Sequence, residues 1–168
     1  MRTWSTFAAA AALVAGLATA SQAQTPVNPL LPTTGTREIA FDGNIQFDPA
    51  TNVNINGSYG PFLNPNLQVG GNFGYSKLEG SDSFYSIGGF ANYHFPGTSA
   101  ALPFVGVFLG VADGGGSDSS FTYGVQGGVK YFLNPNVAAT AALRFQDYSD
   151  DGADSSLGLN FGLAVYLR

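Results

Sequence analysis

The 168-residue chain contains no cysteine, which excludes structural disulfides, thiolate metal sites and acylation of an N-terminal cysteine. His94 is the single histidine, so a metal site built from several histidines is excluded as well. Charged residues make up only 10% of the sequence, against roughly 25% in an ordinary soluble domain. The formal net charge is −5, which argues against a nucleic-acid partner.

Long apolar runs are also missing, apart from one near the N-terminus. Residues 1–23 have the pattern of a secretory signal peptide: Arg2 is the charged start, an apolar run follows from 7 to 20, and small residues come next. We expect cleavage after Ala23 or, alternatively, after Ala20. The Ala-rich run is shorter than the roughly 20 residues that a spanning helix needs. The sequence therefore predicts an exported protein whose only membrane-spanning form is a barrel.

What the chain does have is glycine, aromatic residues and a strict alternation at its C-terminal end. The sequence holds 23 glycines and 14% aromatic residues. In residues 155–168, the odd positions from Leu157 onward are apolar and the even positions are mostly small or polar. Because successive side chains of a strand point to opposite faces, this strand has one apolar face and one small face. The small face suits a narrow interior and the apolar face suits lipid, which disfavours a soluble, lipocalin-like binder.

Seven earlier segments show the same alternation, with their apolar residues again at odd-numbered positions. We call this pattern the parity of the strands. It predicts an all-β fold, an eight-stranded antiparallel up-and-down transmembrane β-barrel over residues 36–168, after the signal peptide 1–23 and an extended Pro-rich leader 24–35. Asn56-Gly57 could form a hairpin turn, but parity continues through it, so we expect one strand there. The predicted strands are Arg37–Phe47, Asn52–Tyr59, Leu67–Lys77, Phe84–Phe95, Pro103–Val111, Phe121–Phe132, Val137–Tyr148 and Ser155–Arg168.

The connections between these strands fall into two alternating sets. One set includes an internal repeat, since Phe62-Leu-Asn-Pro-Asn66 recurs as Phe132-Leu-Asn-Pro-Asn136, and Asn-Pro is a turn signal. With an even number of strands, both termini and these turns are expected on the periplasmic side. The other set is acidic and is expected to face outward; it contains or adjoins Asp48, Glu79, Asp82, Asp113, Asp118, Asp147, Asp150, Asp151 and Asp154.

The mature chain resembles the small outer-membrane β-barrel family that includes OmpA-type and OmpX-type barrels. The similar segments are Pro103-Phe-Val-Gly-Val-Phe-Leu-Gly110, Gly124–Asn136 followed by Ala142–Phe145, and Asn160-x-Gly162-x-x-Val165-x-Leu167. The resemblance implies a location in the bacterial outer membrane, contact with its lipid, and recognition of the C-terminal strand by the insertion machinery. Arg168 stands after the last apolar residue, where the family's signal has a terminal Phe or Trp. We expect no peptidoglycan-binding domain.

Candidate sites for chemistry are few, and we expect no enzyme activity and no cofactor. His94 is followed by Phe95 and Pro96, not by the His-x-Ser pair of outer-membrane lipid A deacylases, and is interpreted as a structural lumen residue. No spacing supports a Ser–His–Asp arrangement. The acidic stretches 113–118 and 150–154 could bind calcium, but neither has EF-hand spacing, so solvated loop tips are the favoured interpretation.

Four charged residues fall at inward-facing positions, namely Glu38, Asp42, Lys130 and Arg144. Charges in a narrow lumen are costly unless they are paired. We hypothesise that Asp42 neutralises Arg144 or Lys130, either as a structural bridge, which is favoured, or as a gate across a water path. Lys77 faces outward near the outer-loop end, where its long side chain can reach lipid headgroup phosphates.

The function that these features favour is a structural or surface-interaction role for a barrel with acidic external loops. Eight strands leave an interior just wide enough for side chains. A narrow or gated pore for small solutes is the alternative, followed by a lipid-modifying enzyme and a soluble lipocalin-like binder. The aromatic residues expected to fill the lumen are Phe84, Phe90, Phe104, Phe108, Phe132 and Tyr166.

Overall fold

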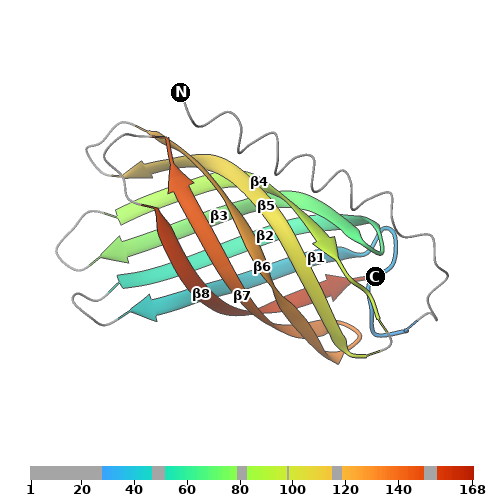
Figure 1. The fold of residues 1–168 in the computed structure, drawn as a ribbon. Coiled ribbons are helices and arrows are strands. Elements are labelled where there is room, and N and C mark those ends of the chain that lie inside the picture. The colour runs from blue at the N-terminus through green and yellow to red at the C-terminus, as the bar shows by residue number, and fades with distance from the viewer. Residues whose placement is uncertain (1–27, 47–51, 79–82, 98, 115–118, 150–154) are drawn as a thin grey trace.

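A computed structural model describes residues 28–46, 52–78, 83–97, 99–114, 119–149 and 155–168. Its eight strands form one closed barrel in which each strand pairs antiparallel with its sequence neighbours and β1 pairs with β8 (Figure 1). The predicted fold class is therefore confirmed. The strands are β1 (Arg37–Gln46), β2 (Asn52–Asn64), β3 (Leu67–Leu78), β4 (Ser83–His94), β5 (Ala101–Gly114), β6 (Ser120–Asn134), β7 (Val137–Tyr148) and β8 (Ser156–Leu167).

The two ends of the barrel differ. We call the end where β1–β2, β3–β4, β5–β6 and β7–β8 connect the loop end, and the opposite end the turn end. The C-terminus and the start of β1 both lie at the turn end (Figure 1). The predicted signal peptide and most of the acidic loop residues lie outside the described residues. No helix among the described residues is long and apolar enough to cross a membrane.

β2 is longer than predicted because it continues through Pro61. Asn56-Gly57 lies inside the strand, so the rejected hairpin is indeed absent. Pro61 pairs with Arg37 of β1, but the ladder of β2 with β3 skips from Tyr59 to Phe62. A proline has no amide hydrogen to donate, so it is tolerated at such an interruption.

The apolar face of the barrel follows the predicted parity. The exposed large hydrophobic residues, from Phe41 in β1 to Leu167 in β8, are odd-numbered with the exception of Phe84. Phe84 is 44% exposed near the start of β4 at the loop end, so it does not fill the interior as predicted. Tyr93 is the converse exception, odd-numbered but only 5% exposed. An apolar belt around a closed barrel is the surface that lipid requires.

Lumen-facing glycines make room for the aromatic side chains of the interior. A Cβ on Gly70 would lie 2.6 Å from the Cα of Gly60 and 2.8 Å from the ring of Phe90. A Cβ on Gly124 would lie 2.5 Å from the Phe108 ring. All three separations are shorter than van der Waals contact, so the high glycine content reflects the narrowness of an eight-stranded lumen.

The repeated Asn-Pro-Asn segments form equivalent turns, as predicted. The side-chain oxygen of Asn64 accepts from the Asn66 amide at 2.9 Å, and that of Asn134 accepts from the Asn136 amide at 2.9 Å. The side-chain amides of Asn66 and Asn136 then donate to the carbonyls of His94 and Tyr166, at 3.1 and 3.0 Å. Each turn thereby forms a hydrogen bond with the strand that follows its own hairpin. The β2–β3 turn binds the end of β4, and the β6–β7 turn binds the end of β8.

The described part of the leader, residues 28–35, folds over the turn end, in contrast to the extended leader that its prolines predict. Residues 28–31 and 33–36 form two turns, closed by Leu31 N–H to Asn28 and Thr36 N–H to Thr33, and Gly35 adopts a φ of 87° in the second. Leu31 is only 6% exposed and belongs to the buried apolar cluster at this end. Tertiary contact outweighs the local extended preference, because burying an apolar side chain is favourable.

Arg168 ties this leader to the last strand. Its guanidinium donates to the carbonyls of Leu30 at 2.5 Å, Leu31 at 3.1 Å and Pro135 at 3.0 Å. These hydrogen bonds bridge the junction between the first strand, β1, and the last strand, β8. The ladder of β1 with β8 runs only from Arg37↔Leu167 to Gly43↔Phe161 and is the shortest of the eight.

Arg168→Gln is expected to lower the free energy of unfolding by about 1–2 kcal/mol, because charged hydrogen bonds to three carbonyls are lost. Urea unfolding in lipid vesicles, followed by the electrophoretic mobility of folded and unfolded chains, measures this. Arg37→Gln removes an exposed cation at the adjoining strand end and is the matched control. Equal effects of the two substitutions would contradict a specific role for Arg168.

Candidate functional site: the barrel lumen

The turn end of the lumen is closed by a buried layer, which we call the seal: Leu31, Phe62, Leu102, Phe132 and Tyr166. Each is at most 6% exposed. The rings of Phe132 and Tyr166 lie 4.8 Å apart, and those of Phe62 and Tyr166 lie 6.2 Å apart. These are ordinary aromatic packing distances, so the described seal is as closely packed as a protein core.

His94 lies next to the seal at the end of β4 and is fully buried. Its ring is 4.9 Å from that of Phe62 and 5.7 Å from that of Phe104, centre to centre. Neither ring nitrogen has a hydrogen-bond partner among the described residues. A general base must lie within hydrogen-bond distance of the proton that it takes, and His94 has no such contact there.

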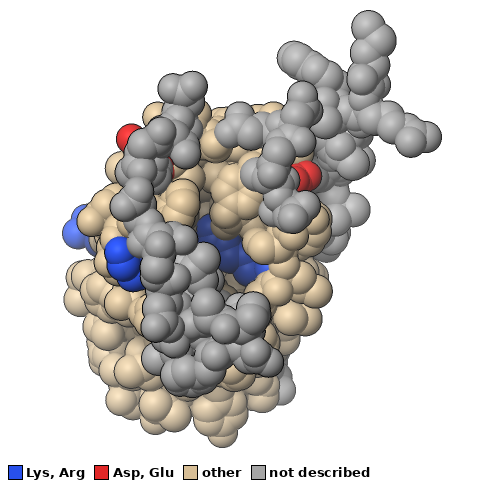
Figure 2. All heavy atoms as spheres, turned by 90° about the vertical axis from the view of Figure 1, so that its left-hand side faces the viewer, with Lys and Arg blue, Asp and Glu red and all other residues tan. Residues whose placement is uncertain are grey.

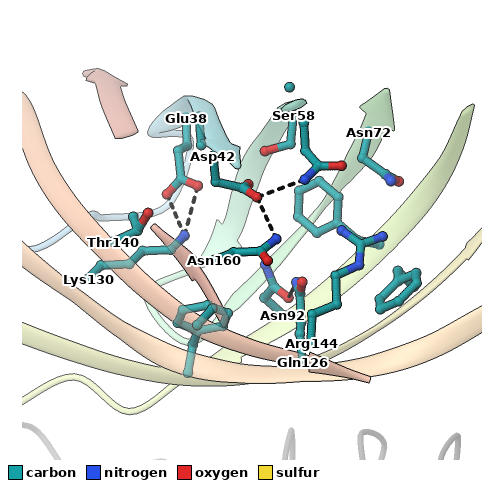
Figure 3. A pocket seen from close by; sticks show the side chains of 17 residues that line it. Glu38, Asp42, Ser58, Asn72, Asn92, Gln126, Lys130, Thr140, Arg144 and Asn160 are labelled. Carbon is teal, nitrogen blue, oxygen red and sulfur yellow. Dashed lines mark hydrogen bonds and ion pairs between the residues drawn. The ribbon is translucent and has the colours of Figure 1, made fainter. Parts of the chain in front are cut away.

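A buried ion pair lies directly above the seal. The ammonium of Lys130 is 2.8 and 2.7 Å from the two carboxylate oxygens of Glu38 (Figure 3). Both side chains are only 4% exposed. The aromatic rings of Phe104 and Phe62 also lie near the ammonium, at 5.2 and 5.9 Å. The carboxylate beside Lys130 is therefore that of Glu38, and not that of Asp42 as hypothesised.

Asp42 accepts hydrogen bonds from two side-chain amides and lines the same inner cavity as Arg144, so the hypothesis that it neutralises the charge of Arg144 stays a prediction. One of its carboxylate oxygens accepts from the side-chain amides of Asn56 at 3.1 Å and Asn160 at 2.9 Å (Figure 3). Among the described residues, no ion pair links Asp42 to Arg144. The guanidinium carbon of Arg144 lies instead 3.7 Å from the ring centre of Phe108, a stacking distance that suits its planar group.

A chain of amides, whose partners the sequence did not reveal, extends from Lys130 across the lumen. Gln68 accepts from Lys130 at 3.3 Å and from Asn92 at 3.5 Å. Gln126 donates to the Asn92 carbonyl oxygen at 2.7 Å. All three amides occupy even-numbered strand positions, so parity assigns them to the lumen, but it does not show which strands meet across it.

Two cavities lie above the seal. An inner cavity of about 70 Å³ is lined by all four inward charges, Glu38, Asp42, Lys130 and Arg144, and has room for a few water molecules. A larger space of about 280 Å³, which we call the vestibule, lies at the loop end. Figure 2 looks at that end and shows basic atoms inside a hollow. The vestibule lining is Asn54, Asn56, Ser76, Arg144, Gln146, Tyr148, Ser156, Leu157, Gly158 and Asn160.

The calcium hypothesis concerns stretches that lie largely outside the described residues. Asp113 and Asp147 are the described acidic residues near the loop end, and the Asp147 carboxylate accepts from the Tyr123 hydroxyl at 3.0 Å. Within the described ranges, no group of three or more His, Asp or Glu side chains is arranged to hold a metal ion.

Comparison of the sequence with known protein families identifies the class to which this barrel belongs. Residues 7–165 match the family described as outer membrane protein beta-barrel domain. The chain belongs to this family. Its place in the outer membrane and its contact with membrane lipid follow from that membership and from the exposed apolar belt. The localisation expected from the sequence is thereby confirmed, whereas the signal peptide stays a prediction.

Solved structures share the fold. The N-terminal barrel domain of Pseudomonas aeruginosa OprF matches with a TM-score of 0.66 and 20% identity, covering 81% of this chain and 100% of that domain. Neisserial surface protein A matches with a TM-score of 0.60 and 25% identity, covering 77% of this chain and 94% of its own. The outer membrane enzyme PagL also matches, with a TM-score of 0.51, 15% identity and coverage of 76% and 98%. No curated protein sequence matches this chain significantly.

Proposed function

We propose that this protein is a closed, non-enzymatic outer-membrane scaffold that presents its loop end to external partners. The observation that carries this proposal is the seal, because a buried apolar layer at the turn end opposes the passage of hydrated solutes. His94 is fully buried and lines neither of the two cavities described above, which favours a structural role for this residue.

Purified wild-type barrel is expected to produce no stable conductance steps in planar bilayers in concentrated potassium chloride. The reason is that the turn end is closed by residues at most 6% exposed, and ions do not cross a packed apolar layer without hydration. Single-channel recording measures this, with an open porin as positive control. Reproducible unitary steps from folded wild-type protein would reject the closed scaffold.

A gated pore is the second candidate, and one observation favours it. Arg144 lines both the vestibule and the inner cavity, so polar surface extends from the loop end down to the seal. Opening would then require that the leader and the seal move, together with the buried Lys130–Glu38 pair above the seal. Conductance that appears only after deletion of residues 24–34 would support this candidate.

We expect two different kinds of contact at the loop end, one made by the predicted acidic loops and the other by Lys77. Negative loops favour partners with positive charge. Lys77 is exposed near the loop-end terminus of β3, and we propose that its ammonium contacts lipid headgroup phosphates. Lys77→Gln is expected to weaken association with phosphate-rich lipid by about 1 kcal/mol, measured by native mass spectrometry of lipid retention. Unchanged retention would remove this contact.

A further inference from the structure

The pairing of the first and last strands is incomplete at the loop end. The ladder of β1 with β8 ends at Gly43↔Phe161, although both strands continue beyond it. Asn44–Gln46 stay paired with β2, and Ser156–Asn160 stay paired with β7. Among the described residues no pair joins these two segments, and we call the interval between them the notch. At about 3.3 Å per residue the notch is roughly 10 Å long on the β1 side and roughly 15 Å long on the β8 side.

The vestibule reaches the lipid-facing surface beside the notch. Leu157 lies on the outward face by parity and, at 72%, is the most exposed large hydrophobic residue described. It also lines the vestibule, together with the lumen residue Asn160 of the same strand. A residue that belongs to both surfaces marks a place where the lumen and the membrane meet. The outer flank of β8 here is apolar, since Leu159 and Phe161 are exposed as well.

We propose that the notch admits the head of a single-chain amphiphile from the adjacent lipid leaflet into the vestibule, while the chain stays in the lipid along the outer face of β8. The ligand class is an amphiphile with a neutral, hydroxylated head, such as one sugar unit. The vestibule measures about 280 Å³, close to the lower limit of the roughly 300–1,000 Å³ found for small-molecule pockets. This site goes beyond the scaffold role and does not depend on it, because the seal closes the opposite end.

The strand edges at the notch favour hydroxyl groups. A strand edge presents N–H donors and C=O acceptors in alternation, and these groups are costly in hydrocarbon unless they are paired. A hydroxyl donates one hydrogen bond and accepts two, so it can pair with either kind of group. A phosphate oxygen only accepts, and a quaternary ammonium group has no N–H to donate. A head that carries several hydroxyls therefore fits both edges of the notch.

The charge of the lumen favours a neutral head. Apart from Arg144, the polar side chains that line the vestibule are amides and hydroxyls, as in Gln146, Tyr148 and Ser156. The inner cavity below it is lined by two acidic and two basic side chains, so neither sign is in excess there. An ionic head would add an unpaired charge to this space, which is costly, whereas a sugar adds none.

The test uses the folded wild-type barrel in phospholipid nanodiscs, with dodecyl β-glucoside added at low mole fraction in the lipid. NMR records the nuclear Overhauser effects from the sugar protons to the protein. We expect contacts with both the Leu157 methyl groups and the Gln146 side-chain amide, because the head lies between the outer face and the lumen. Dodecylphosphocholine has the same chain but no hydroxyl, and is expected to bind at least about tenfold more weakly. Free glucose does not partition into lipid and is expected to give neither contact.

Two leucine substitutions separate the vestibule from the general lipid surface. Gly158 lines the vestibule next to the notch, so Gly158→Leu is expected to weaken glucoside binding at least about tenfold. Gly127→Leu is the matched control and is expected to bind as the wild type does. It adds the same side chain to the outward face of β6, where a Cβ would come no closer than 3.6 Å to a neighbouring atom.

The proposal is overturned if the sugar contacts Leu157 but not Gln146, if the two heads bind equally, or if free glucose gives the same contacts. It is also overturned if a folded Gly158→Leu barrel binds as well as the wild type. The wild-type contacts stand by themselves even where a variant folds poorly. A negative result here leaves the conductance prediction untouched, so failure of this site and failure of the closed scaffold are distinguishable.

Discussion

Glu38→Gln is expected to lower the free energy of unfolding by about 3–5 kcal/mol, because it leaves the Lys130 ammonium buried without its carboxylate. Both side chains are only 4% exposed, so water cannot replace the lost partner. Gln68 remains 3.3 Å from the ammonium, but a neutral amide compensates only part of a buried charge. The two nearby aromatic rings do not remove the need for an anion.

The measurement is urea unfolding in lipid vesicles, with the folded fraction read from electrophoretic mobility. The only tryptophan, Trp4, lies in the predicted signal peptide, so tryptophan fluorescence would not report on the mature barrel. The double variant Glu38→Gln with Lys130→Met is the control and is expected to recover most of the loss, because no charge remains to be desolvated. A double variant that is no more stable than Glu38→Gln alone would show that the two residues are not energetically coupled.

Val129→Arg is expected to cost about 2–4 kcal/mol of membrane folding free energy, since it places a guanidinium in the apolar belt near mid-bilayer. Val129 is 37% exposed on the outer face of β6. Refolding yield and urea unfolding in vesicles of constant lipid composition measure the effect. Its cross-strand neighbours, Pro103 and Ala141, carry no polar side chain that could offset the charge.

Gln126→Arg is the matched lumen substitution on the same strand and is expected to cost much less. Gln126 lines the inner cavity, where a guanidinium can be hydrated. Its cross-strand partner is Arg144, so part of its cost is like-charge repulsion, which salt screens only weakly inside the lumen. If Gln126→Arg were as damaging as Val129→Arg, the assignment of the two faces would be wrong.

The faces of the strands could be read from sequence because lipid and a narrow lumen impose opposite chemistry on alternate residues. Odd-numbered Leu157 to Leu167 are exposed in the structure, and even-numbered Asn160, Ala164 and Tyr166 are buried. The Asn-Pro-Asn turns could also be read, since their side-chain bonds span only two residues. Phe84 shows the limit of parity. The alternation assigns each residue to one face of the sheet, but it does not predict whether other parts of the protein cover the end of a strand.

Partners across the lumen could not be read in this way. Glu38 and Lys130 are 92 residues apart and lie on β1 and β6, which are not neighbours in the barrel. Which side chains meet there depends on depth, and depth depends on the tilt and stagger of the closed sheet. The same stagger places the Asp42 carboxylate beside two side-chain amides and the Arg144 guanidinium against the ring of Phe108.

The sequence by itself determined the strand number, the lipid-facing side of each strand and the family, because each of these follows from local alternation or short motifs. Only the tertiary structure decided that Glu38 pairs with Lys130, and that residues 28–36 fold across the turn end with Arg168 binding Leu30 and Leu31. Those contacts join segments far apart in the chain, so they exist only once the barrel has closed.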